Sequence, residues 1–169
     1  MSEATAQEAE EIAMRQRAAG VLAGASTAEL AECWNAWPNR PEVEYLRGPE
    51  SGLVMVQGRI GGSGDRFNLG EATVVRATAL VRGGGLATEC VGTSYVLGSD
   101  PDHAGLAAVF QALLADPGQR DLVLQQVIEP LQSRQATVDA GSRAQARATT
   151  VNFFTVAREN SGGVEEDDE

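Results

Sequence analysis

The segment between Glu42 and Leu97 constrains the fold most, because its apolar residues recur with a period of two while both flanks follow a helical period. It contains four alternating or β-branched runs, at residues 43–46, 53–60, 71–82 and 86–97. Glycine-containing segments separate these runs, and Gly83-Gly84-Gly85 is typical of a hairpin turn. The pattern predicts a roughly four-stranded, mainly antiparallel sheet.

Two helices are predicted before this block. Residues 7–23 are rich in Ala, Glu and Arg and favour a first helix. Ser26-Thr27-Ala28-Glu29 is a capping box, which predicts a second helix over residues 27–36. Trp37-Pro38 should end that helix, because the residue before a proline disfavours the helical conformation.

Further helices are predicted after the block. Asp100 suits an N-cap and Pro101 the first helical position, with an apolar face that lasts to about residue 114. Residues 133–150 are rich in Ala, Arg and Gln, so this helix has few large side chains to bury on its own chain. We therefore expect one α+β domain over residues 1–160: N-terminal helices, the sheet, then C-terminal helices.

The composition excludes several kinds of chemistry. All 13 cations are arginines, so there is no lysine for a Walker A motif or a Schiff base. One histidine and two cysteines, Cys33 and Cys90, show no metal-ligand spacing, and two buried thiols are the favoured interpretation. No set of residues is therefore expected to catalyse a reaction alone, and no cofactor is expected on this chain alone.

The charge balance bears on partners and on location. The formal net charge is −11, which disfavours binding to nucleic acid or to an anionic membrane. Residues 161–169 end in five acidic residues and are predicted to be a disordered, solvated tail. Apolar runs are too short to span a membrane and no secretory signal is visible, so a cytoplasmic location is expected.

Three segments are candidates for function. Between Arg59 and Arg66, the glycines Gly61, Gly62 and Gly64 form either a phosphate-binding loop or a tight, bulged connection. His103, near Asp100 and Asp102, is either a general acid or base, or an exposed or interface residue at a helix start. Phe153 and Phe154, followed by Arg158, are either a core plug or an interface anchor.

Five segments carry a resemblance that spans about residues 12–158. In order they are Ala28-Glu29-Leu30-Ala31; residues 57–67 with Gly70-Glu71-Ala72-Thr73 and Arg76; residues 92–100 with His103-Ala104; Ser133-Arg134-Gln135-Ala136; and Val151-Asn152-Phe153-Phe154-Thr155. In this order they resemble PhnG, the family of small G subunits of bacterial carbon–phosphorus lyase. The chain departs from the family pattern at Ser99, where the family usually has arginine, and at Asn152 and Val156, where it has Asp and Met.

The resemblance implies a cytoplasmic core complex with the H, I and J subunits. With an ATP-binding accessory subunit, the I subunit displaces adenine from ATP by a phosphonate. The product is ribose 1-phosphonate 5-triphosphate. The J subunit then cleaves the C–P bond by using an iron–sulfur cluster and S-adenosylmethionine. The family assigns the G subunit no catalytic residue that transfers to this sequence.

Two expectations follow from the resemblance, and two alternatives compete with it. We expect direct contact with the I subunit through the glycine-rich loop, the helix start at Asp100 and His103, and the terminal phenylalanines. We also expect Arg59, Arg66 and His103 to border a triphosphate site shared between subunits. The alternatives are a free-standing small hydrolase or transferase that uses His103 with Asp100 or Asp102, and a pure scaffold with no role near the substrate.

Overall fold

The computed structural model describes residues 2–148 of the chain. Two helices, α1 (Ser2–Gly24) and α2 (Thr27–Ala36), precede three strands, β1 (Glu42–Arg59), β2 (Arg66–Arg82) and β3 (Cys90–Leu97). Helices α3 (Pro101–Ala115), α4 (Pro117–Val123) and α5 (Glu129–Ala148) follow, and a π-helical turn, Leu124–Ile128, joins the last two. The predicted α+β class and element order are confirmed.

The helix starts form as the sequence predicts. At α2 the backbone N–H of Ser26 donates to Oε2 of Glu29 at 2.8 Å, and the N–H of Glu29 donates to Oγ of Ser26 at 3.3 Å. At α3, Asp100 is the N-cap and Pro101 the first helical residue. These starts are predictable because a few adjacent residues satisfy the free N–H groups of the first turn.

The sheet has three antiparallel strands in the order β1-β2-β3, rather than the four expected. The two runs predicted as separate strands join into one long β1, because β2 is long enough to pair with both. The expected turn at residues 48–52 is instead an irregularity in β1, with register shifts on both sides of Arg47. Pro49 is tolerated there because it lies at a bulge in an edge strand, where its missing N–H breaks no ladder.

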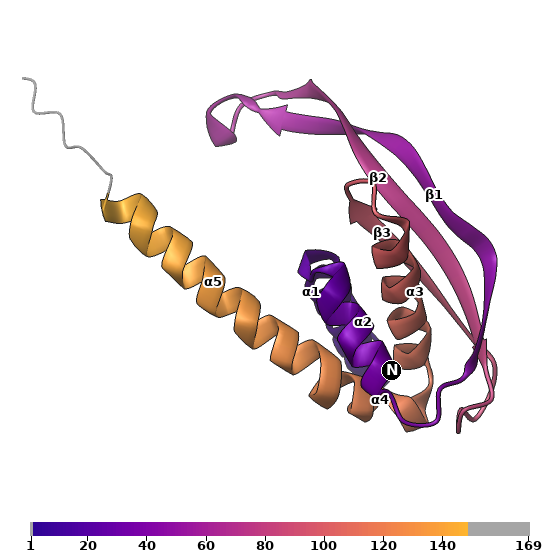
Figure 1. Cartoon of the computed structure of the whole chain (residues 1–169). Coiled ribbons are helices and arrows are strands. Elements are labelled where there is room, and N and C mark those ends of the chain that lie inside the picture. Colours follow the sequence, from indigo (N-terminus) through magenta and orange to yellow (C-terminus); the bar gives the residue numbers. More distant parts are fainter. Residues whose placement is uncertain (1, 149–169) are drawn as a thin grey trace, which may run out of the picture.

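The described helices all lie on one side of the sheet, which curves around α3 (Figure 1). Phe110 of α3 is fully buried and packs edge-on against Trp34 and Trp37, with ring centroids 6.2 and 5.9 Å away. Helix α3 approaches β3 closely at Gly92, where an added Cβ would lie 2.1 Å from the carbonyl oxygen of Ala108. The core therefore lies between α3 and the concave face of the sheet, with α1 and α2 packed outside α3.

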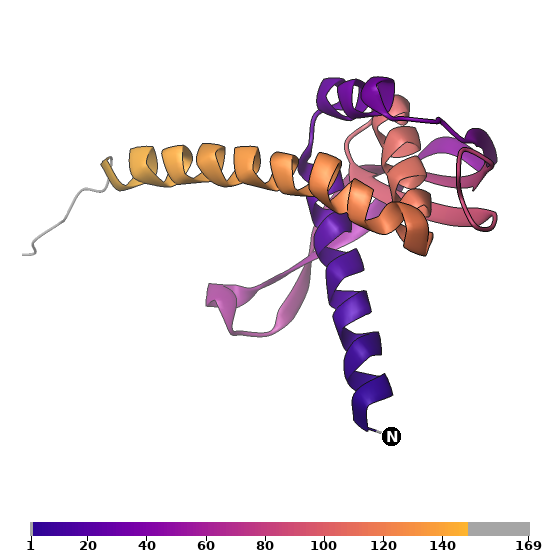
Figure 2. The same cartoon turned by 90° about the horizontal axis from the view of Figure 1, so that it is seen from below.

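Three elements extend beyond this body (Figure 2). The N-terminal part of α1, the outer part of α5 and the far end of the β1–β2 hairpin point in different directions. The side chains of α5 beyond Gln135 are exposed, which agrees with the prediction of a helix with little to bury on its own chain. Pro130 does not end this helix, since the π-helical turn immediately before it adjusts the hydrogen-bond ladder.

Candidate functional site

The β1–β2 hairpin continues past the end of β3 as a two-stranded ribbon, here called the arm (residues 53–73). The last pair between β2 and β3 is Val74 with Leu97, whereas β1 and β2 stay paired as far as Arg59 with Arg66. An isolated two-stranded ribbon is only marginally stable in water. The arm is therefore well suited to gain stability by contact with a partner.

The tip of the arm is a tight turn that requires its glycines. Gly61 and Gly62 have φ values of 58° and 83°, in the region that favours glycine. The N–H of Gly64 donates to the carbonyl oxygen of Ile60 at 2.8 Å, and an added Cβ on Gly64 would lie 2.7 Å from that oxygen. One N–H of the loop is thus used within the turn itself, as the tight-connection interpretation of this segment requires.

The two faces of the arm tip differ in chemistry. Gln57 pairs with Asn68, whose Oδ1 accepts from Nε2 of Gln57 at 3.2 Å, and Arg59 pairs with Arg66 on the same face. On the opposite face Phe67 and Leu69 approach Gly58, at which an added Cβ would lie 2.9 Å from a Leu69 methyl carbon. The tip is therefore polar and cationic on one face and apolar on the other.

The apolar face of the arm continues onto a face of the sheet that none of the described helices covers (Figure 1). We call this the open face. Val75 and Val96 form a pair in the core, so the next pair, Val74 and Leu97, points to the opposite side. The large apolar side chains of the open face are Val54, Val56, Phe67, Leu69, Val74, Leu80, Val91, Tyr95 and Leu97. Tyr95 is 59% exposed and Leu97 is 74% exposed.

The arginines of the open face are each paired with a glutamate within the chain. Nε of Arg76 lies 2.6 Å from Oε1 of Glu50, and Arg82 pairs with Glu44. Thr78 and Thr93 lie opposite each other and share a hydrogen bond of 3.3 Å. The face thus offers apolar side chains beside arginines that are already paired, which is the character of the centre of a protein interface.

The second predicted region, the start of α3, is stabilised mainly from within the chain. The Asp100 carboxylate accepts from the N–H groups of Asp102 and His103, at 3.0 and 3.2 Å, and from the Thr27 hydroxyl. The bond from Thr27, followed by the backbone bonds, lowers the pKa of Asp100 below its usual range. Because Asp100 already occupies this helix N-terminus, an external anion would have to displace it.

Ser99, where the family usually has arginine, is exposed in the loop that precedes Asp100.

His103 is buried, with 8% of its surface exposed, so the interpretation as an exposed residue at the helix start is wrong. Its Nε2 lies 2.9 Å from the carbonyl oxygen of Leu22, so this nitrogen carries the proton and donates it to the last turn of α1. The sequence did not show this contact because it joins residues 81 apart. The geometry assigns His103 to the packing of α3 on α1 and gives no support to a free-standing enzyme that uses it.

A hollow beside this helix start is lined by Thr27, Ala31, Tyr45, Pro49, Pro101, Asp102 and Leu106. Tyr45 lies over Gly105, where an added Cβ would be 2.6 Å from the tyrosine oxygen. Burial raises the pKa of Tyr45, and the Asp102 carboxylate adds to the effect. With a carboxylate in its wall and the helix N–H groups already bonded, this hollow is unfavourable for phosphate.

The structure does not bring the predicted triphosphate residues together. The N–H of Gly98, just before Asp100, donates to the carbonyl oxygen of Thr73, and Arg66 lies seven residues further along β2. Seven residues of strand span roughly 23 Å. Arg59 and Arg66 therefore lie together at the arm tip, whereas Asp100 and His103 lie together at the start of α3.

The remaining predicted site residues, Phe153, Phe154 and Arg158, lie outside the described residues.

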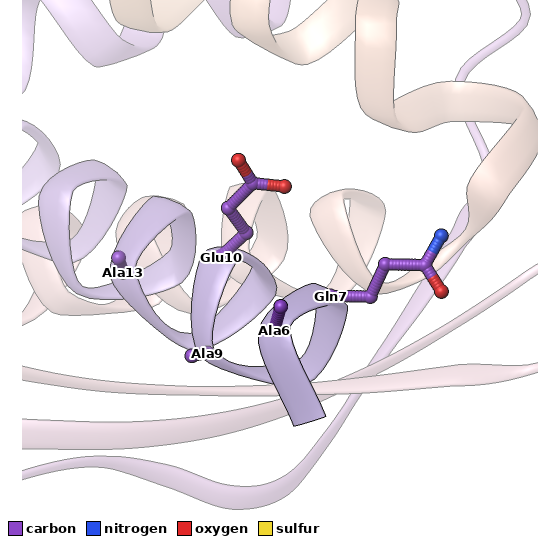
Figure 3. A pocket seen from close by; sticks show the side chains of 5 residues that line it. All are labelled: Ala6, Gln7, Ala9, Glu10 and Ala13. Carbon is purple, nitrogen blue, oxygen red and sulfur yellow. The ribbon is translucent and has the colours of Figure 1, made fainter. Parts of the chain in front are cut away.

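Another hollow runs along the first turns of α1 and is lined by Ala6, Gln7, Ala9, Glu10 and Ala13 (Figure 3). All five residues come from one helix, and the side chains of Gln7 and Glu10 point in different directions. Within residues 2–148 no cluster of three metal-ligating side chains occurs, and no helix is long and apolar enough to cross a membrane. The arm tip and the open face are therefore the stronger candidates for function.

Fold and surface together define a class: a small α+β domain with an uncovered sheet face and a projecting β ribbon. Residues 13–159 match the family model described as "Phosphonate metabolism protein PhnG". The chain is 45% identical, over 147 residues, to a protein of Rhizobium meliloti (strain 1021) named "Alpha-D-ribose 1-methylphosphonate 5-triphosphate synthase subunit PhnG". That match covers 87% of this chain and 90% of the relative. The chain belongs to the PhnG family, as the ordered motifs predict.

Proposed function

We propose that this chain is an accessory, non-catalytic subunit of a ribose 1-methylphosphonate 5-triphosphate synthase, the C–P lyase complex of phosphonate catabolism. The observation that carries the proposal is the 45% identity, over nearly the whole length of both chains, to a subunit of that synthase. The complex would convert ATP and methylphosphonate into ribose 1-methylphosphonate 5-triphosphate and adenine. The catalytic groups would belong to its other subunits.

The partners in this proposal are the H, I and J subunits, together with an ATP-binding accessory subunit, in a cytoplasmic assembly. ATP is a substrate of the complex, and the iron–sulfur cluster and S-adenosylmethionine belong to the J subunit. The resemblance supports these assignments. The acidic net charge of this chain supports a protein partner over a nucleic acid or a membrane.

The open face is the surface that we assign to the I subunit. Its apolar side chains would be buried by a partner of matching apolar character, because the arginines of this face are already paired within the chain. The sheet curves around α3, so the open face is convex, and two copies of it would meet along a narrow line only (Figure 1). This shape favours a different chain with a concave, apolar groove over a second copy of this chain.

The arm extends this contact, since Phe67 and Leu69 continue the apolar surface to the tip. The terminal aromatic pair, Phe153 and Phe154, with Arg158, is a further contact in the proposal and rests on sequence alone. His103 contributes indirectly by holding α3 against α1.

Co-expression with tagged homologues of the H, I and J subunits tests the assignment. We expect this chain to co-purify in fixed ratio with them, and the purified assembly to release adenine from ATP and methylphosphonate. The isolated chain should release none, and an assembly prepared without it should lose activity. Turnover by the isolated chain, or full turnover by an assembly that lacks it, would contradict the proposal.

A further inference from the structure

The arm tip holds two arginines that lack an acidic partner. Arg59 and Arg66 are direct cross-strand partners, so their side chains leave the same face of the ribbon side by side. Within residues 2–148, neither has a carboxylate within 4.0 Å. By contrast Arg47, Arg76 and Arg82 of the same sheet each pair with a glutamate.

The surroundings of this pair are polar and partly fixed. Nη1 of Arg59 donates to the carbonyl oxygen of Gly64 at 3.2 Å, which holds its guanidinium near the turn. The Gln57 amide lies two residues before Arg59 on the same face and is held in turn by Asn68. Gln57, Gly58, Arg59 and Arg66 line a hollow at this place. Two guanidinium groups and an amide thus converge on an open space.

Like charges directly opposite each other in a sheet are destabilising, so the bare pair is unfavourable until an anion lies between them. A guanidinium presents its N–H groups in a planar fork that matches phosphate oxygens, and two of them suit a chain of several phosphates. The tip is open to solvent on this face, so its arginines alone would hold such an anion only weakly. The described residues that line the hollow all come from the arm, and a firm site requires a second wall, which we assign to a partner.

We propose that Arg59 and Arg66 bind the polyphosphate of a nucleoside triphosphate, or of the triphosphate product derived from it, in a site completed by a partner subunit. The inference rests on the proposed function. The apolar face of the tip, with Phe67 and Leu69, docks against the partner, and the opposite face turns the two arginines toward the anion. A polyphosphate suits the site because both guanidinium groups face one open space. His103 has no part in it, since the helix start lies roughly 23 Å away along the sheet.

Steady-state kinetics of the assembled complex test the site. Arg59→Ala and Arg66→Ala should each raise KM for ATP about ten-fold, with kcat changed less than about two-fold, because each removes a charged hydrogen bond to the phosphates. Inorganic triphosphate should inhibit the wild-type complex competitively, and its Ki should rise in parallel in both variants. Arg143→Ala, at an exposed arginine on α5, is the matched control and should leave KM and Ki unchanged.

Size-exclusion chromatography of the same complexes shows whether the variants still assemble. It therefore distinguishes anion binding by the two arginines from a role of these arginines in assembly. Arginine variants that assemble like wild type but show the higher KM and Ki support an anion site. Unchanged KM and Ki in both arginine variants overturn it. Loss of assembly on Arg59→Ala or Arg66→Ala overturns it too, because that result would assign the arginines to carboxylates of a partner. A wild-type chain that never enters the complex would overturn the proposed function and this inference with it.

Discussion

Asp100 joins two helix starts through one carboxylate. It accepts from the backbone of α3 at Asp102 and His103 and from the hydroxyl of Thr27, the first residue of α2. The Glu29 carboxylate likewise stabilises the start of α2, where it accepts hydrogen bonds from Ser26. These hydrogen bonds lower the pKa of Glu29. Both carboxylates are stabilised in the charged form, so protonation of either one weakens a helix start.

The lowered pKa of Asp100 predicts a specific acid sensitivity. Because the folded-state pKa lies below the usual value of 3.8, the stabilisation is complete above that value and is lost as pH falls through the folded-state pKa. Asparagine also caps helices but carries no titrating charge, so Asp100→Asn should lose less stability than wild type between pH 5 and about pH 2.5. Urea unfolding midpoints over this range measure the effect.

The exposed Asp121→Asn is the control for that comparison and should keep the wild-type slope. Parallel pH profiles for wild type and Asp100→Asn would show that the cap contributes no acid sensitivity.

At the scale of elements, local signals explain what the sequence could predict. The capping box at Ser26 and the Asp100-Pro101 start predicted α2 and α3 because each depends on neighbouring residues. The prediction of two separate strands in place of β1 was wrong because Gly48-Pro49 has the composition of a turn. The chain continues as one strand there because β2 is long enough to pair with both halves of β1. The burial of His103 depends on α1, which is distant in sequence and is brought close only by folding.

The contact between α3 and β3 predicts a severe effect at one glycine. An added Cβ at Gly92 would lie 2.1 Å from the oxygen of Ala108 and 2.2 Å from the nitrogen of Ala112, both backbone atoms that cannot move independently. Gly92→Ala should therefore lower the free energy of unfolding by about 3 kcal/mol, as overpacking in a rigid core does. Urea denaturation followed by circular dichroism measures the change.

Gly52→Ala provides the matched control, because this glycine lies in β1 with no atom within 4 Å of an added Cβ. Its free energy of unfolding should change by less than about 0.5 kcal/mol. Equal effects at the two positions would contradict close packing of α3 on β3.

At the scale of the whole molecule, the described helices cover one side of the sheet. The covered side was predictable, since helical segments before and after the strands need a sheet to pack on. The open face was not predicted, although the sequence of β3 contains a signal for it. Val91, Tyr95 and Leu97 are apolar at the positions that alternate with the buried Cys90, Ser94 and Val96. A strand that is apolar at both sets of positions is typical of burial on both faces, and residues 2–148 bury only one of them.

The open face therefore predicts that partner binding and folding stability can be separated by mutation. Tyr95→Ser with Leu97→Ser removes two large, exposed apolar side chains, so the free energy of unfolding should change by less than about 1 kcal/mol. Capture of the tagged I homologue should fall at least about ten-fold, because aromatic and aliphatic side chains at the centre of an interface contribute most to affinity. Ile12→Ser on α1, also an exposed apolar residue, should leave capture unchanged. If the double variant captures the I homologue as wild type does, while Ile12→Ser does not, the interface lies on α1 rather than on the sheet.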